Sequence, residues 1–324
     1  MKRILFCLIC LVLSILTFSQ EEDRLLVTEI KQSTVITEPA TLRKGFFRIG
    51  SIFTYAVEDK VFDDNRSRTY STGNGWGKYS TESLQLVYGF TNRIELALVF
   101  PYKFKSIHLS FLNEVPFSDT SLLIKLKTKG NGLGDITVGV NIQIIEGSKN
   151  KPSLTGTLTA SLPTGRKDPT NIKDLLIYDY PTGSGELSLI PELIFRKVTY
   201  PFSWSLFAGL QYGFGCDKIM VPNEEVSHFK SGIRWQTGGN FNFLVNDWIA
   251  IQNELVFDNK KADTYKGNTI LASTPGYDSW ALFYSPGLSF QFKKFRLNQG
   301  FAIPLAGKMT MADPQFNLTL QYIL

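Results

Sequence analysis

Histidine and cysteine are scarce in this chain of 324 residues, and their scarcity narrows the chemistry open to it. Only His108 and His228 occur. Histidine carries much of enzymatic acid–base catalysis and binds most protein zinc, so neither a histidine-based active site nor a zinc centre is expected. Of the 3 cysteines, Cys7 and Cys10 lie in an N-terminal apolar run. Removal of that run leaves Cys216 with no partner for an intramolecular disulfide.

Long hydrophobic runs are missing beyond the N-terminus. Residues 1–3 carry positive charge, Ile4–Phe18 is apolar, and small residues near position 19 precede the acidic residues 21–23. This order predicts a secretory signal peptide over 1–19. A membrane anchor is the alternative, but the apolar run is shorter than the roughly 20 residues that a spanning helix needs. No later stretch approaches the roughly 18 consecutive apolar residues of a helical span.

Strong charge and cofactor motifs are absent too. Loss of Lys2 and Arg3 leaves 32 of the 34 basic residues against 29 acidic ones, which gives no reason to expect a nucleic-acid partner. The run Asp63-Asp64-Asn65 lacks the spacing of a calcium loop. Residues 130–135 are rich in glycine but lack the dinucleotide-binding spacing, and no helix pattern follows them. We therefore expect no metal and no other cofactor.

Aromatic residues and two-residue alternation are what the chain has in abundance. Aromatic residues make up 13% of the sequence and include 25 Phe, and such residues favour strands. Residues 133–145 show the pattern, because Ile136, Val138 and Val140 alternate with Thr137 and Gly139. The alternation predicts strands over 45–58, 77–90, 93–105, 133–145, 152–163, 185–197, 202–214, 231–245, 248–258, 279–292, 295–305 and 314–324.

The connections between these strands alternate in length. Short turns such as 91–92, 246–247 and 293–294 alternate with longer connections such as 106–132 and 164–184. Short turns at one end and long loops at the other are typical of outer-membrane barrels. We therefore predict an all-β fold, a transmembrane antiparallel up-and-down β-barrel of about 12 strands. It occupies 44–324 and follows an N-terminal arm over 20–43, either periplasmic or inside the bore. A periplasmic β-sandwich is the alternative, since it also alternates.

The alternation continues through Leu324. Phe316, Leu318, Leu320, Tyr322 and Leu324 share one parity. In a closed barrel the last strand pairs with the first and leaves no edge, so we expect 314–324 to pair with 45–58. Such a strand, over 316–324, is also what the barrel-assembly machinery of the Gram-negative outer membrane reads.

Several short motifs resemble an outer-membrane family named for the MetA-pathway of phenol degradation. They are Gly132-Leu133-Gly134-Asp135, Leu162-Pro163-Thr164-Gly165, Thr182-Gly183-Ser184-Gly185 and the segment Tyr88–Glu95. The resemblance covers much of 80–200. It implies a transporter-type barrel that passes small, aromatic or hydrophobic compounds, and it carries no catalytic residues.

If the apolar parity faces lipid, the other parity lines the interior. Eight charged residues on it are candidates for a substrate pathway: Arg48, Glu95, Glu186, Glu192, Arg196, Arg234, Glu254 and Arg296. Charges of both signs either pair across an interior or line a wet path. The sequence thus predicts an outer-membrane channel or transporter for a small-molecule permeant. A structural or surface-interaction barrel with a closed lumen stays open, as does an outer-membrane enzyme.

Lipid is the remaining partner that the sequence suggests. We expect outer-membrane lipid around the barrel, with lipopolysaccharide on its outer side. Lys125, Lys127 and Lys129 lie in the long connection 106–132. They belong either to an extension strand or to a surface that binds lipopolysaccharide.

Overall fold

The computed structural model describes residues 41–70, 76–114, 121–148, 151–174, 177–219, 225–266 and 277–324. The predicted signal peptide 1–19 and all but the end of the arm 20–43 lie outside these residues. Within the described ranges the secondary structure is strand, with no helix, and hence no helix that could cross a membrane.

Twelve strands form one closed antiparallel barrel, which confirms the predicted fold class and overturns the β-sandwich alternative. Each predicted strand matches one of them. They are β1 (Phe47–Glu58), β4 (Trp76–Gly89), β5 (Ile94–Glu114), β7 (Ile136–Ile145), β8 (Ser153–Leu162), β11 (Ser188–Thr199), β12 (Phe202–Gly213), β15 (Arg234–Asn246), β16 (Ile249–Lys260), β18 (Ser279–Phe292), β19 (Phe295–Lys308) and β21 (Gln315–Ile323).

The first and last strands close the barrel, as predicted. β1 pairs with β21 in antiparallel register, with Arg48 opposite Ile323. Beyond the ladder, the Leu324 amide donates to the Phe47 carbonyl at 2.8 Å. The other side of β1 pairs with β4 along its whole length. No barrel strand therefore has an open edge.

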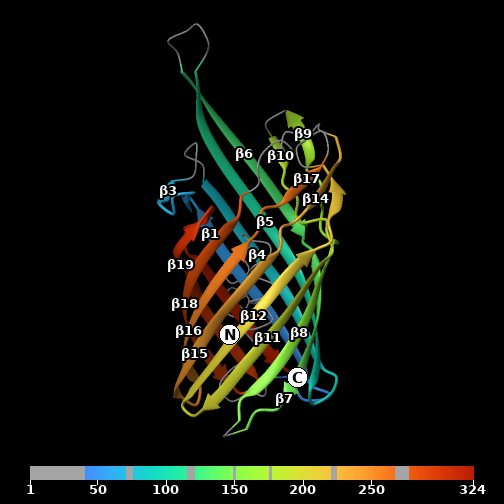
Figure 1. Cartoon of the computed structure of the whole chain (residues 1–324), viewed down its shortest axis with the longest axis vertical. Coiled ribbons are helices and arrows are strands. Elements are labelled where there is room, and N and C mark those ends of the chain that lie inside the picture. The colour runs from blue at the N-terminus through green and yellow to red at the C-terminus, as the bar shows by residue number, and fades with distance from the viewer. Residues whose placement is uncertain are drawn as a thin grey trace, which may run out of the picture.

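One hairpin rises well above the barrel rim (Figure 1). β5 does not end near residue 105, as the sequence predicted, but runs to Glu114, and its upper half pairs with β6 (Ser121–Leu133). The connection 106–132 is thus largely strand. Lys125, Lys127 and Lys129 lie on β6, which confirms the extension strand as their place.

Two small sheets extend the barrel at the end where the long connections lie (Figure 1). One is formed by β2 (Lys60–Phe62), β3 (Arg68–Tyr70) and β20 (Thr310–Met311). The other is formed by β13 (Cys216–Lys218), β14 (Ser227–Lys230) and β17 (Thr264–Lys266). The short strands β9 (Thr170–Asp174) and β10 (Ile177–Asp179) continue from β6. By the loop-length rule of outer-membrane barrels this is the extracellular end.

Alternation along the strands separates an apolar outer face from a polar inner face. On β7, Val138 and Ile142 are 42% and 44% exposed, whereas Thr137 and Asn141 are 0% and 5% exposed. A soluble protein would bury the first pair; here the polar pair is buried. This inversion is what a membrane-spanning barrel requires.

Aromatic side chains on the outer face form two girdles. Near the periplasmic end, outward-facing rings pair at Phe47–Tyr88 (4.5 Å between centroids) and Phe295–Tyr322 (4.6 Å). Near the extracellular end, Trp235, Phe257 and Trp280 form a row on adjacent strands, with centroids 5.1 and 5.9 Å apart. Along a strand the girdles lie about ten residues apart, which at ~40° tilt spans about 25 Å of membrane.

Candidate functional site

The inner face of the barrel gathers most of the predicted site residues. Seven of the eight are buried: Arg48, Glu95, Glu186, Glu192, Arg196, Arg234 and Arg296 are between 1% and 7% exposed. Glu254 is partly exposed and lies on the inward parity of β16. They fall into three groups at different heights in the barrel.

The first group lies at the periplasmic end around Glu95. Its carboxylate accepts the Asn141 side-chain amide at 2.6 Å and the Leu42 backbone amide at 2.7 Å, and Arg48 Nη2 lies 3.9 Å away. Thr41, 2% exposed, donates to the Asn92 carbonyl. The described end of the N-terminal arm thus lies against the inner wall.

Arg296 extends this polar group along the neighbouring strands. Its Nη1 donates to Gln321 Oε1 at 3.3 Å, and Gln321 donates in turn to Gln85 Oε1 at 3.4 Å. These residues come from β19, β21 and β4, and Arg48 comes from β1 between them. Polar side chains of adjacent strands therefore cover one side of the inner wall near the periplasmic end.

The second group surrounds an apolar band on the opposite side. Strand registers place six inward residues in one row, each opposite the next: Ile194, Phe207, Gly238, Val256, Phe283 and Pro304. Phe207 lies against Gly238, where a Cβ atom would come within 2.5 Å of the ring. The row spans β11 to β19 and places two aromatic rings on the inner wall.

Charged and polar rows flank this band on both sides. Toward the extracellular end the row is Glu192, Gly209, Gln236 and Asp258. Toward the periplasm it is Arg196, Ser205, Asn240 and Glu254. The structure therefore places three predicted residues, Glu192, Arg196 and Glu254, beside this apolar band. Sequence reasoning missed the band, because the strand registers decide which residues share a row across strands.

Arg234 lies one row further toward the extracellular end and forms an ion pair. Its Nε and Nη2 donate to the two Asp258 oxygens at 2.8 and 2.9 Å. The bidentate geometry is the strong form of this interaction. Asp258 was missing from the predicted set, although its parity on β16 matches that of Glu254.

Several buried polar atoms of the inner wall have no hydrogen-bond partner among the described residues. They are Thr137 Oγ1, Gln211 Oε1, Asn242 Oδ1, Ser289 Oγ and Asn298 Oδ1. Leaving such groups dry costs about 1–3 kcal/mol each, and ordered water is their usual partner when protein offers none. Ordered water inside the barrel is therefore the expected partner of these atoms.

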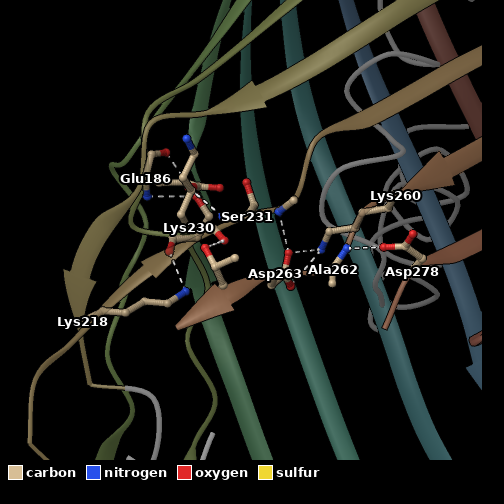
Figure 2. A network of polar contacts seen from close by, with 11 residues as sticks. Glu186, Lys218, Lys230, Ser231, Lys260, Ala262, Asp263 and Asp278 are labelled. Atoms are coloured by element: carbon tan, nitrogen blue, oxygen red, sulfur yellow. Dashed lines mark hydrogen bonds and ion pairs between the residues drawn. The ribbon is translucent and has the colours of Figure 1, made fainter. Parts of the chain in front are cut away.

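The third group lies at the extracellular rim, where Glu186 contacts backbone rather than charge. Its Oε2 accepts the amides of Gly215 at 3.1 Å and Ser231 at 3.3 Å (Figure 2). It thus links the ends of three strands, β11, β12 and β15. Four more rim carboxylates also accept backbone amides, and sequence reasoning did not assign this role to any of them.

These rim carboxylates accept backbone amides of an adjacent connection or, for Asp278, of its own connection between β16 and β18. Asp263 accepts the Gly232 amide at 2.9 Å and Asp278 the Ala262 amide at 3.0 Å (Figure 2). Asp313 accepts the amides of Asp59 and Lys60 at 2.8 and 2.7 Å. Hydrogen bonds from Lys261 and from the Ala262 backbone lower the pKa of Asp278, while burial and a hydrogen bond to Asp313 raise the pKa of Asp59.

Asp135 is the fourth of these rim carboxylates, and it connects three of the motifs on which the family resemblance rests. It accepts the Gly165 amide at 2.9 Å and the Ser184 amide at 2.6 Å. Thr164 Oγ1 donates to the Gly134 carbonyl at 3.2 Å, and a Cβ on Gly183 would lie 2.7 Å from Gly165 Cα. The three motifs therefore meet at one place and fasten the loop 163–187 to the rim.

Fold and site together define an outer-membrane β-barrel, and comparisons agree. A family model described as "Putative MetA-pathway of phenol degradation" matches residues 63–303. The chain belongs to this family, as the motifs predicted. No curated protein matches the chain.

Solved structures share the fold at low sequence identity. An outer membrane channel from Pseudomonas putida F1 matches with a TM-score of 0.67 and 13% identity, over 89% of this chain and 100% of that one. The beta domain of the Bordetella autotransporter Brka matches at 0.47 with 10% identity, covering 86% and 98%. The CymD monoaromatic hydrocarbon channel matches at 0.46 with 8% identity, covering 87% and 88%. The last two scores are below 0.5, so of these three structures the first is the one that bears on the fold.

Proposed function

We propose that the barrel passes small molecules passively across the outer membrane through its interior. The observation that carries the proposal is the inner wall, where buried polar atoms require water and charges of both signs lie beside an apolar band. Twelve strands at ~4.8 Å spacing and ~40° tilt give a backbone diameter of roughly 24 Å. Side chains of about 6 Å on each wall leave roughly 12 Å, which suits a small solute.

The apolar band favours small amphipathic permeants, aromatic ones among them. Phe207 and Phe283 are 5% and 3% exposed, so a permeant ring would pack on them by displacing what covers them. Its polar substituent would then reach the flanking rows, which hold Arg196, Glu254 and Glu192. Aromatic pairs contribute about 0.5–1.5 kcal/mol beyond burial, enough to favour entry without trapping the solute. The family description, with its reference to phenol degradation, supports this choice.

Planar bilayers and liposomes test the proposal. Folded protein should conduct ions in a bilayer and admit phenol into liposomes. Phe283→Ser should lower phenol influx severalfold and leave ion conductance unchanged or higher, whereas Phe283→Tyr, which keeps the ring, should keep the influx. A sealed bilayer over folded protein would contradict passage, and equal influx through both variants would remove the band from the pathway.

A closed structural barrel is the second candidate, favoured by the internal pairing of Arg234 with Asp258 and of Glu95 with Asn141 and Leu42. Internal pairing stiffens a wall without any flow. It predicts no conductance and no solute influx by protein whose gel mobility shows it folded. The bilayer measurement separates the two candidates directly.

We infer that the chain is not an enzyme. One observation speaks against this inference. Ser106 Oγ lies 3.3 Å from His108 Nε2, close to the distance at which a histidine base accepts the proton of a serine nucleophile. Both residues lie on β5 near the rim. A serine-reactive fluorophosphonate should leave the protein unlabelled; labelling lost in Ser106→Ala would establish an active serine instead.

We infer two further partners, the barrel-assembly machinery and lipopolysaccharide. The support for the first is β21, whose outward parity runs through Leu320 and ends at Leu324, 48% and 52% exposed. For the second, the extracellular girdle lies where the outer leaflet meets water. Crosslinking from position 320 during assembly should capture the machinery's barrel subunit, and loss of that crosslink on scrambling 316–324 tests the assignment.

A further inference from the structure

Two cations lie on the extracellular aromatic girdle. Lys230 Nζ donates to the Tyr212 hydroxyl at 2.9 Å and lies 4.5 Å from the centroid of that ring. The Arg66 guanidinium carbon lies 5.8 Å from the centroid of Trp280. Both rings face outward, from β12 and β18. Each cation therefore sits where lipid meets water on the outer side of the membrane.

Neighbouring cations of the rim pair with carboxylates, whereas these two have no carboxylate partner among the described residues. Lys261 pairs with Asp278 at 2.6 Å, Lys308 with Asp64 at 2.6 Å and Lys260 with Asp263 at 3.0 Å. Within the part of the chain that the structure describes, neither Lys230 nor Arg66 has a carboxylate within 4.0 Å. Within that part of the chain their charge has no anionic partner.

The surface between them is apolar and continuous. Trp235 and Phe257 bridge the gap from β12 to β18, and Phe214 and Ile233 are 51% and 42% exposed nearby. Three interstrand spacings separate Tyr212 from Trp280, roughly 15 Å. That span suits one disaccharide headgroup with a phosphate at each end and acyl chains below.

We propose that Lys230 and Arg66 bind the phosphates of a phosphorylated glycolipid of the outer leaflet. The phosphate oxygens accept charge-assisted hydrogen bonds from the ammonium and guanidinium groups, and the acyl chains pack on the outward face between β12 and β18. The site rests on the membrane location of the barrel and not on the proposed passage of solutes. Lys230 lies beside Ser231, whose amide Glu186 holds (Figure 2), so its segment is fixed.

Binding of bisphosphorylated lipid A to the full chain in detergent tests this site. Native mass spectrometry should show one tightly retained lipid. Lys230→Gln and Arg66→Gln should each weaken binding about fivefold and the double variant about 25-fold, since a cation at an anionic surface contributes that much. Lys230→Arg should retain binding, and unchanged gel mobility should verify that every variant folds.

Lys293 supplies the matched control. Its Nζ lies 5.5 Å from the Phe292 centroid at the periplasmic end, in similar geometry, so Lys293→Gln should bind lipid A like the parent chain. Lipid A without phosphates should bind weakly, and excess inorganic phosphate should not displace the glycolipid. Equal affinity of the parent chain and the double variant, or of lipid A with and without phosphate, would overturn the proposal. Solute conductance is expected to be the same in all these variants.

Discussion

At the scale of single residues, the interior of this barrel is governed by how each charge is neutralised. Arg234 and Asp258 neutralise each other, and their side chains are 8% and 11% exposed. Glu95 is held by an amide, a backbone N–H and an arginine. Removing one partner changes both stability and the field along the inner wall, because the other charge remains.

Arg234→Ala should therefore shift ion selectivity toward cations. The Asp258 carboxylate would then face the interior without the Arg234 guanidinium, and the free energy of unfolding should fall by about 3–5 kcal/mol. Reversal potentials in a salt gradient measure the selectivity, and urea titration of the gel shift measures stability. Arg234→Ala with Asp258→Ala should restore both toward the parent values. Unchanged selectivity in the single variant would place Arg234 outside the ion path.

Gly183 offers a test of close backbone approach. A Cβ atom there would lie 2.5 Å from Asp135 Oδ1 and 2.7 Å from Gly165 Cα, so Gly183→Ala should separate the two loop segments and cost about 1–3 kcal/mol locally. Faster limited proteolysis within 163–187 is the measurement. Gly156→Ala is the control, since its nearest neighbour is a flexible Ile144 methyl at 3.2 Å. Equal cleavage of both variants would argue against the tight approach.

At the scale of elements, rim carboxylates fasten several extracellular connections to their neighbours. Asp135→Ala removes a carboxylate that accepts three hydrogen bonds, from Gly165 N, Ser184 N and Ser184 Oγ. Hydrogen bonds to a charged group contribute about 1.5–3 kcal/mol, so opening of 163–187 should rise at least tenfold. Hydrogen exchange of the Gly165 and Ser184 amides measures this, with the β7 and β8 ladder as internal reference. Protection equal to the parent chain would contradict the fastening role.

Two parts of this rim should respond to pH in opposite directions. The pKa of Asp59 is raised above 3.8, so the folded state favours the protonated form of its carboxyl group. The hydrogen bond between Asp59 and Asp313 therefore weakens as pH rises through the raised pKa. The pKa of Asp278 is lowered below 3.8, so its contacts with Lys261 and Ala262 are lost as pH falls through that value. Exchange at the Lys60 and Ala262 amides, corrected for intrinsic rates, should show opposite trends. Asp59→Asn should abolish the first trend only.

The elements themselves were largely readable from the sequence, and the rim was not. Period-two alternation located all twelve barrel strands, since a wall between lipid and a polar interior imposes that pattern on each strand separately. The extension of β5 to Glu114 was missed, because above the membrane no lipid enforces the alternation. Asp135 and Glu186 bind backbone amides of distant connections, and any carboxylate can do so. The apolar row of Phe207 and Phe283 required the register of five strand pairs.

At the scale of the whole molecule, closure is what makes the apolar outer face and polar inner face possible. Every barrel strand is hydrogen-bonded on both sides, so no backbone polar group need face lipid. The same closure holds the inner rows in register and keeps the two girdles at constant separation. A closed barrel of this kind unfolds as a unit, and unboiled protein in mild detergent should migrate differently from boiled protein. Identical mobility, with the protein found soluble in the periplasm, would contradict the fold.

The seam between β1 and β21 is where closure can be tested most directly. Deletion of 316–324 removes the partner of both β1 and β19, which leaves two open edges in lipid, each unsatisfied group costing several kcal/mol. Such a chain should show no mobility shift and no stable insertion. Deletion of Leu324 alone removes the two backbone hydrogen bonds with Phe47, at 2.8 and 3.4 Å, and leaves the rest of the ladder, so it should retain the shift with a lower unfolding midpoint. A normal shift in the longer deletion would mean that β19 and β1 can pair directly, and that eleven strands suffice to separate lipid from the interior.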